Sequence, residues 1–258
     1  MPVTSSNWAW NELVTEHPRR VQLAPGYILH HHPYRDTSRI LEVLTRDAGR
    51  MSIFARGVRG PKAKLASELQ PFRLLLLSWS GKGDAPMLSG AESAPDQVTL
   101  PPACLMSGFY LNELLLKLTM RHDPVPAVFD AYHNALESLK HGAGLESTLR
   151  LFEKRLLDLL GYGVDLDVDA RTGASIEPDA YYHFRPGYGV FPTTAGAPDA
   201  LLGASIISLS REQVSSAREL EDAKRLLLAA LASCLEGREL STRKVARSVA
   251  RRAPRSRR

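Results

Sequence analysis

The sequence predicts an α+β protein in which a small N-terminal β-barrel is followed by a C-terminal α-helical domain. Before Pro95 the apolar residues alternate with polar ones in short runs, whereas after Pro102 they recur every three or four residues. Side chains alternate across a strand and repeat roughly every 3.6 residues around a helix, so the change of period marks a change of structure. At 258 residues the chain is long enough for two modest domains.

Five short strands are expected in the first part of the chain. Pro33 ends the first strand because proline has no amide proton for a strand ladder, and the turn Asp47-Ala48-Gly49 leads into the third. Five strands within about 70 residues indicate a small closed barrel, of which the OB-fold is the common form that binds nucleic acid. We place this barrel at residues 18–95, after a flexible extension over residues 1–17. The expected strands are Val21–His32, Ser38–Thr45, Arg50–Arg56, Pro71–Trp79 and Pro86–Ser93.

The second domain, over residues 103–237, is expected to be a helical bundle. Asp123-Pro124 separates its first two helices, and Gly161 ends the third. Between residues 162 and 204 the helical period gives way to Gly, Pro, Asp and aromatic residues, which predicts an irregular insert. The expected helices are Leu105–Leu118, Val128–Leu139, Leu145–Leu160 and Arg211–Glu236.

Positive charge gathers towards the two ends of the chain. Residues 17–82 hold twelve Arg or Lys against four Asp or Glu, residues 84–237 hold twelve against twenty-one, and residues 238–258 hold nine against one. Two basic ends around an acidic middle predict that a polyanion such as nucleic acid is bound at the ends. We expect the basic tail over residues 238–258 to bind phosphates without reading sequence.

The basic residues of the barrel lie in or beside its turns, where an OB-fold usually exposes its ligand face. Flexible cations there can neutralise successive phosphates, and Tyr34 and Phe54 offer rings on which bases can stack. A charged face that only keeps the domain soluble would carry mixed signs, which the excess of cations disfavours. The candidate DNA-binding residues are Arg35, Arg39, Arg50, Arg56, Arg59, Lys62 and Lys64.

No set of residues indicates a catalytic site, a metal ion or another cofactor. His30 and His32 can lie on one side of a strand, but no third ligand accompanies them. The segment around Gly81 and Lys82 lacks the first glycine and the Ser or Thr of a phosphate-binding loop. We therefore expect a protein without enzymatic activity.

Three aspartates in the insert leave a metal-dependent nucleic-acid enzyme as an alternative. Asp165, Asp167 and Asp169 could in principle hold a hard cation. The segment lacks the glycine and the terminal glutamate of a calcium loop, which favours a solvated acidic strand.

The two cysteines, Cys104 and Cys234, stand far apart in apolar helical stretches, which is typical of reduced core thiols in the cytoplasm. No apolar run reaches the roughly 20 residues needed to span a bilayer. We expect a cytoplasmic protein with no membrane contact.

Short segments are spread along nearly the whole chain, and it is their combination in this order that is specific. The segments are Gly26–Leu29, Pro33–Ser38, Thr45–Arg50, Gly57–Lys62, Leu69–Phe72, Ser78–Gly81, Tyr110–Leu115, Arg150–Glu153, Leu160–Gly163 and Gly237–Arg243. Together they resemble the RecO family of bacterial recombination mediators.

The resemblance implies a mediator of DNA repair and homologous recombination that associates with the nucleoid. Such a protein would bind single- and double-stranded DNA, anneal complementary strands and, with its partner RecR, help to load the recombinase onto DNA coated by single-strand-binding protein. The resemblance also implies that the helical domain accepts the acidic, hydrophobic C-terminal peptide of that coating protein. Arg150 and Lys154 are the candidate contacts for this peptide.

Two expectations remain beside this one. Many members of the family carry a four-cysteine zinc site in the region of residues 162–204, but this region has no cysteine here, so we expect the metal site to be lost. An OB-fold module that binds RNA is an alternative to a DNA repair mediator.

Overall fold

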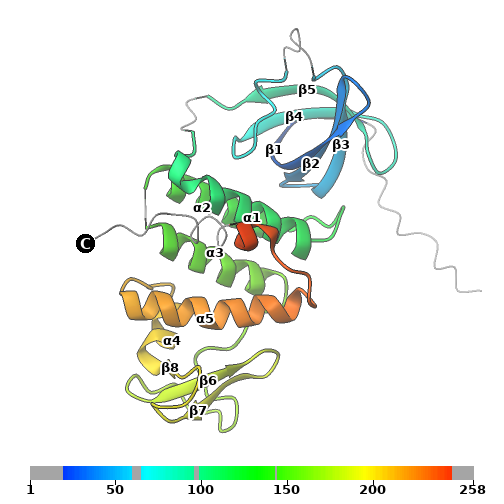
Figure 1. The fold of residues 1–258 in the computed structure, drawn as a ribbon. Helices are drawn as coiled ribbons and strands as arrows, with labels where there is room; N and C mark the ends of the chain where they lie inside the picture. The colour runs from blue at the N-terminus through cyan, green and yellow to red at the C-terminus, as the bar shows by residue number, and fades with distance from the viewer. Residues whose placement is uncertain (1–19, 60–64, 96–98, 143, 246–258) are drawn as a thin grey trace, which may run out of the picture.

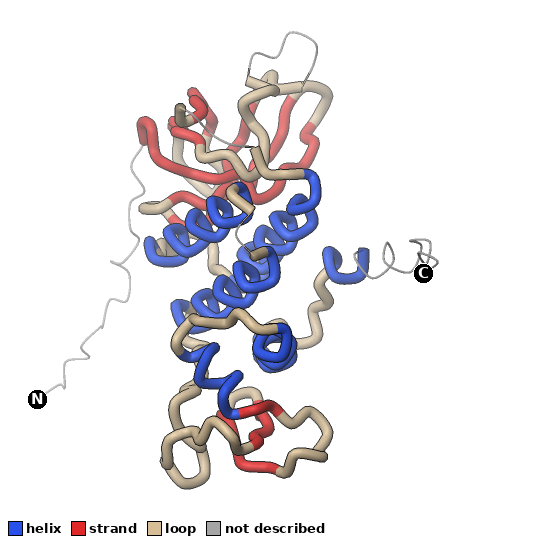
Figure 2. Tube along the Cα trace, turned by 90° about the vertical axis from the view of Figure 1, so that its left-hand side faces the viewer, coloured by secondary structure: helices blue, strands red, loops and turns tan. Residues whose placement is uncertain are grey.

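The computed structural model describes residues 20–59, 65–95, 99–142 and 144–245. In this part of the chain a β-barrel lies at one end, a layer of helices in the middle and a small sheet at the other end (Figures 1 and 2). The predicted α+β class, with strands before helices, is confirmed. The expected N-terminal extension and most of the basic tail fall outside the described residues.

The barrel closes in the order β1-β2-β3-β5-β4. Neighbouring strands are antiparallel except β3 and β5, which pair in parallel through Phe54 and Met87. Gly49 enters β3 with a φ of 68°, and a Cβ there would lie 2.5 Å from the carbonyl oxygen of Asp123, so this turn requires glycine. The strands are β1 (Arg20–Tyr34), β2 (Ser38–Thr45), β3 (Gly49–Ala55), β4 (Leu75–Ser80) and β5 (Met87–Ser93).

The fourth strand is shorter than the apolar run predicts. It begins at Leu75 rather than Pro71, because Phe72 adopts a positive φ of 66° and packs outside the barrel against Phe109. The remaining expected strands agree with the observed ones to within two residues at each end.

Among the described residues, five helices follow the barrel, and residues 241–245 at the end of that part are also helical. The fifth helix begins at Ala217 rather than Arg211, because Ser216 and Glu219 form a capping box, and a short helix that the sequence did not predict precedes it. The helices are α1 (Leu105–Leu118), entered through a 3₁₀ turn (Pro102–Cys104), α2 (Pro126–Lys140), α3 (Leu145–Leu159), α4 (Gly203–Ser210) and α5 (Ala217–Cys234).

The insert that was expected to be irregular contains a three-stranded sheet in the order β7-β6-β8. Its strands are β6 (Tyr181–Arg185), β7 (Gly189–Thr193) and β8 (Leu201–Leu202). The sheet lies beyond α5, at the end of the molecule opposite the barrel (Figure 1).

The apolar core of the helical domain extends into the outer face of the barrel. Tyr27, Leu29 and Leu44 are 0–4% exposed and belong to the same cluster as the helices, whereas a second cluster fills the barrel interior. Asn112 Nδ2 of α1 donates a hydrogen bond of 2.8 Å to the carbonyl oxygen of Leu29. The two domains therefore share a buried interface that fixes the barrel on α1 and α2.

Candidate nucleic-acid surface and helical pocket

The loop between β1 and β2 presents aromatic rings and cations together. The guanidinium of Arg35 lies 5.4 Å from the centre of the Tyr34 ring, and that ring meets Phe54 of β3 edge-on with ring centres 5.2 Å apart. Arg59 Nη1 donates a hydrogen bond of 3.1 Å to the carbonyl oxygen of Arg35, which ties the two loops together. Tyr34, Arg35 and Arg59 are exposed. We call Tyr34, Arg35, Phe54 and Arg59 the barrel tip.

Two further predicted cations of the barrel lie on or directly after its strands. Arg56 is exposed directly after β3, and Arg39 is half-buried in β2. Lys62 and Lys64 lie outside the described residues. The structure therefore brings two of the predicted cations together with the two predicted rings.

Arg50 turns away from the barrel tip and joins the barrel to the helices. Its Nη1 lies 3.1 Å from Glu42 Oε2, and its Nη2 donates a hydrogen bond of 2.8 Å to the carbonyl oxygen of Thr119. Arg121 pairs with the same carboxylate of Glu42. Only 12% of the Arg50 side chain is exposed, and burial lowers the pKa of its guanidinium. The guanidinium of Arg50 is bonded within the protein and is poorly placed to bind a phosphate.

The histidine run of β1 forms a pair rather than a cluster of ligands. The rings of His30 and His32 lie 4.4 Å apart, and burial followed by the charge of His32 lowers the pKa of His30. Within the described ranges, no three His, Cys, Asp or Glu side chains are grouped so that they could hold a metal ion.

The three aspartates of the insert have separate partners. Asp165 Oδ1 accepts the backbone N–H of Asp167 over 3.0 Å, and Asp167 Oδ1 accepts the hydroxyl of Ser210 over 2.5 Å. Asp169 is 5% exposed and accepts hydrogen bonds from its own turn. Each carboxylate thus stabilises a local turn or contact, and their arrangement gives no support to a shared cation site.

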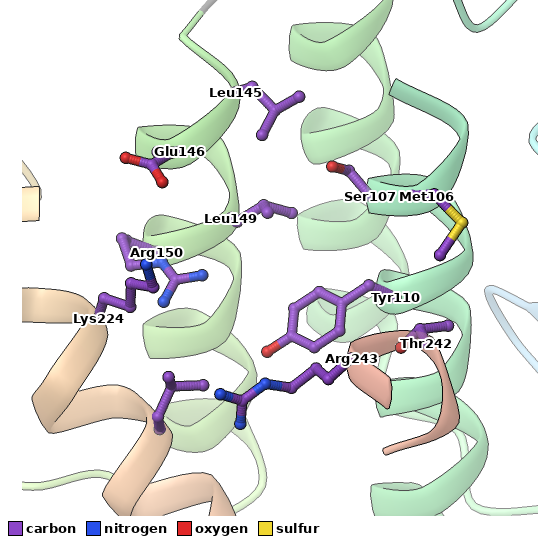
Figure 3. A pocket seen from close by; sticks show the side chains of 11 residues that line it. Met106, Ser107, Tyr110, Leu145, Glu146, Leu149, Arg150, Lys224, Thr242 and Arg243 are labelled. Carbon is purple, nitrogen blue, oxygen red and sulfur yellow. The ribbon is translucent and has the colours of Figure 1, made fainter. Parts of the chain in front are cut away.

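A pocket of about 250 Å³ lies between α1, α3, α5 and the residues that follow α5 (Figure 3). Its apolar wall includes Met106 of α1 and Leu145 and Leu149 of α3. Cationic side chains enter it from three different elements, as Figure 3 shows. We call this cavity the helical pocket, and its cations are Arg150, Lys224 and Arg243.

A buried carboxylate contacts two of the residues that line the helical pocket, Tyr110 and Arg150. Glu153 is fully buried, accepts the hydroxyl of Tyr110 over 2.6 Å and lies 2.9 Å from Arg150 Nη2. Burial raises the pKa of the Glu153 carboxyl, although the charge of Arg150 opposes this. Within the described residues the Nε and Nη1 of Arg150 have no hydrogen-bond partner. A buried guanidinium therefore retains unused donors beside an apolar cavity.

Of the two cations predicted for a peptide, only Arg150 lines the helical pocket. Lys154 Nζ lies 2.8 Å from Asp158 Oδ2 and 3.9 Å from Glu212 Oε1, away from the pocket. Sequence patterns do not single out Lys224 or Arg243, which stand on later elements. The sequence signals for Arg243 are its place in the basic tail, which was expected to bind phosphates, and in one of the segments that carry the family resemblance.

Comparison with known proteins covers both domains. The family model described as Recombination protein O N terminal matches residues 21–94, and the one described as Recombination protein O C terminal matches residues 103–244. The chain belongs to the recombination protein O (RecO) family.

Relatives named DNA repair protein RecO are similar to the chain over most of their length. The protein of Methylococcus capsulatus is 41% identical over 231 residues, which cover 90% of this chain and 95% of the relative. Those of Coxiella burnetii and Nitrosococcus oceani are 40% and 41% identical over 228 residues, covering 88% and 87% of this chain and 98% and 92% of the relatives. The chain is therefore a DNA repair protein of the RecO family.

Two structural features bear on the expectations for this RecO-family protein. Among the described residues, no helix is both long and apolar enough to cross a membrane. The insert does not fit a zinc ion, because it has no cysteine and the buried turn at Asp169 is closed by hydrogen bonds instead.

Proposed function

We propose that this protein is a non-enzymatic mediator that binds single- and double-stranded DNA and anneals complementary strands. With RecR it would help to load the recombinase onto nucleoid DNA coated by single-strand-binding protein. The observation that carries this proposal is the barrel tip, where Arg35 lies over the exposed ring of Tyr34 and Arg59 bonds to the Arg35 backbone. The role of RecR is an inference from the family alone.

Charge neutralisation gives the proposed annealing its physical basis. Two phosphate backbones repel each other until cations screen both of them, and base pairing then supplies the driving force without nucleotide hydrolysis. Arg35, Arg39, Arg56 and Arg59, together with Lys62 and Lys64 of the sequence, would supply this screening. Arg50 is left out, since Glu42 and Thr119 occupy its guanidinium.

The rings of the barrel tip favour single strands. Bases stack on aromatic side chains with about 1–3 kcal/mol per base, and this interaction tolerates any sequence. In a duplex the bases are already stacked, so that duplex DNA would depend on phosphate contacts alone. The same surface would therefore hold both forms of DNA in different ways.

The helical pocket is the proposed site for the C-terminal peptide of single-strand-binding protein. An apolar wall at Met106 and Leu149 suits a hydrophobic side chain, and the unused donors of Arg150 suit a carboxylate. Lys224 and Arg243 add positive charge at the same cavity. Binding there would bring the mediator to coated DNA.

An annealing assay tests the DNA part of the proposal. Complementary strands coated with single-strand-binding protein are mixed without nucleotide, with either the intact protein or an Arg56→Ala/Arg59→Ala variant. We expect the intact protein to accelerate annealing and the variant to do so much less. The matched control is Arg171→Ala/Arg211→Ala, which removes two exposed arginines of the helical domain and insert.

Two outcomes would contradict this function. Equal annealing by the barrel variant and the control would exclude the cations after β3, Arg56 and Arg59, as the working surface. Tighter binding of RNA than of single-stranded DNA in a competition assay would favour the RNA-binding alternative.

A further inference from the structure

Glu153 of α3 is a buried acid beside a pocket that is proposed to receive another acid. Its side chain is fully buried, and its Oε1 accepts the hydroxyl of Tyr110 over 2.6 Å and lies 2.9 Å from Arg150 Nη2. Its other oxygen, Oε2, has no hydrogen-bond partner among the described residues. An ionised carboxylate is costly in such a place, because burial removes the water that would solvate its charge.

Three cations from three elements act on this carboxyl. Arg150 lies one turn before Glu153 on α3, Lys224 lies on α5, and Arg243 belongs to the residues that follow α5. Figure 3 shows these three side chains around the helical pocket. Burial nevertheless raises the pKa of the Glu153 carboxyl, although each of the three cations opposes it. The carboxyl is therefore held close to protonation even before a ligand arrives.

The neighbouring tyrosines remain neutral. Tyr110 reaches Glu153 from α1, and Tyr132 of α2 packs edge-on against Phe152 with ring centres 6.3 Å apart. Burial raises the pKa of both hydroxyl groups, so that neither changes its charge near neutral pH. Tyr110 therefore donates to Glu153 whether or not the carboxyl is ionised.

A bound carboxylate would have to share Arg150 with Glu153. The Nη2 of Arg150 faces Glu153, whereas its Nε and Nη1 have no hydrogen-bond partner in the part of the chain that the structure describes. A ligand that pairs with these donors places one guanidinium between two carboxylates, and these three groups then carry a net negative charge. When two carboxylates share one site, the pKa of one of them rises.

Glu153 is the better of the two carboxylates to take up the proton. It is fully buried, whereas a ligand enters through the open side of the pocket. A proton on its Oε2 also breaks no hydrogen bond, because the contacts with Tyr110 and Arg150 are both made by Oε1.

We propose that Glu153 is a positioning residue that links peptide binding to proton uptake. When a carboxylate of the partner peptide pairs with Arg150, Glu153 takes up one proton from solvent at Oε2, and the peptide therefore binds more tightly as the pH falls. The linkage is reciprocal, since a ligand that favours the protonated form is itself favoured by protonation. This inference rests on the proposed peptide function of the helical pocket.

The neutral pH range isolates the contribution of Glu153. The carboxyl groups of a free peptide titrate at about pH 3.5–4, and the amino and guanidinium groups of lysine and arginine titrate above about pH 10. No histidine is among the described residues that line the helical pocket. A change of peptide affinity between about pH 6 and about pH 8 would therefore come from the buried carboxyl.

Calorimetry on the intact protein counts the proton directly. The probe is a short acidic peptide that ends in phenylalanine with a free carboxylate. Titrations at one pH in phosphate and in Tris, whose heats of ionisation differ, give the number of protons taken up on binding. We expect about half a proton at about pH 7, and an affinity about fivefold higher at about pH 6 than at about pH 8.

A variant assigns the proton to its residue. Glu153→Gln retains an oxygen that accepts from Tyr110 but cannot ionise. We expect it to bind the peptide without proton uptake, with the same affinity at both pH values, and about fivefold more tightly than the parent at about pH 8. The matched control is Glu146→Gln, at an exposed carboxylate that lines the same pocket, and it should retain the proton uptake of the parent.

The outcomes separate this proposal from the proposed function of the pocket. If the peptide binds to the parent without proton uptake between about pH 6 and about pH 8, the linkage is wrong while the helical pocket stands. This result needs no variant, so it holds even if Glu153→Gln does not fold. Uptake that persists in Glu153→Gln, or that is lost in Glu146→Gln, also overturns the role of Glu153. If the peptide does not bind at all, the peptide function of the pocket fails, and the linkage fails with it.

Discussion

Arg50 of β3 and Glu42 of β2 form an ion pair of 3.1 Å whose side chains are only 12% and 7% exposed. The pair lies where the barrel meets the helical domain, and Ser52 also donates a hydrogen bond of 2.6 Å to Glu42 Oε1. Arg121 reaches the same carboxylate from the loop after α1. One buried anion thus connects two strands of the barrel with the helical domain.

Neutralising this anion should destabilise the protein. Glu42→Gln leaves the guanidinium of Arg50 buried without a counter-charge, which costs about 3 kcal/mol. The change appears as a lower midpoint in urea unfolding. Glu92→Gln, at an exposed carboxylate of β5, is the matched control and should stay within about 0.5 kcal/mol of the parent. Equal midpoints for the two variants would contradict a structural role for Glu42.

Removing the Tyr34 ring of the barrel tip should weaken binding of single-stranded DNA more than binding of duplex DNA. Tyr34→Ala deletes the exposed ring next to Arg35, and the affinity for single strands should fall about tenfold. Duplex affinity should change much less, because it depends on phosphate contacts. Fluorescence anisotropy with both substrates measures the difference, with Tyr188→Ala on the exposed turn of the insert as control. The same loss on both substrates would exclude stacking.

Asp169 should stabilise the insert without any metal. Its Oδ1 accepts the backbone N–H of Arg171 and its Oδ2 accepts the hydroxyl of Thr172, both over 2.8 Å. Asp169→Ala should therefore lower the unfolding midpoint, and a chelator should affect neither the parent nor the variant. A decrease of the parent midpoint on chelation would show that a metal ion stabilises the insert after all.

The capping carboxylate of α5 should make the folding stability depend on pH in the acidic range. The hydroxyl of Ser208 and the backbone N–H of Ser216 donate to Glu219 over 2.6 and 2.8 Å, and such bonds lower its pKa from 4.5 to about 2. Because the folded pKa lies below the unfolded one, this stabilisation is present above pH 4.5 and is lost as the pH falls from 4.5 towards 2.

A Glu219→Gln variant checks this dependence. It should be less stable than the parent by about 1 kcal/mol at neutral pH. The difference should shrink as the pH falls from 4.5 towards 2, because Glu219 takes up a proton in the unfolded parent over this range while it stays ionised in the folded parent. A difference that stays constant over this range would show that the charge of Glu219 does not stabilise α5.

Local patterns were sufficient to predict the barrel strands except the start of β4. The span Ser38–Thr45 is the same in prediction and structure, because Ile40, Leu41, Val43 and Leu44 make a short apolar run and turn residues bound both ends. The start of α5 was predicted too early, since the apolar period continues before Ser216 whereas the capping box sets the first turn.

The functional surfaces depend on contacts that local patterns do not contain. Arg50 resembles the other loop cations in sequence, but its position in β3 directs it to Glu42 and Thr119. The helical pocket needs α1, α3, α5 and residues 238–245 at once, and Arg243 lines the same cavity as Arg150 because Glu113 holds those residues against α1. The barrel tip was easier to foresee, as Tyr34 and Arg35 are adjacent in the chain.

The core that Tyr27, Leu29 and Leu44 share with the helices has a mechanical consequence. A hinge between the domains would have to expose these side chains to water, so the molecule acts as a rigid spacer. In the proposed function, a DNA strand at one end and a partner peptide further along would keep a constant separation and mutual orientation. DNA would then pass to a recombinase through exchange of the DNA or the peptide bound at one end, since the distance between the two ends does not change.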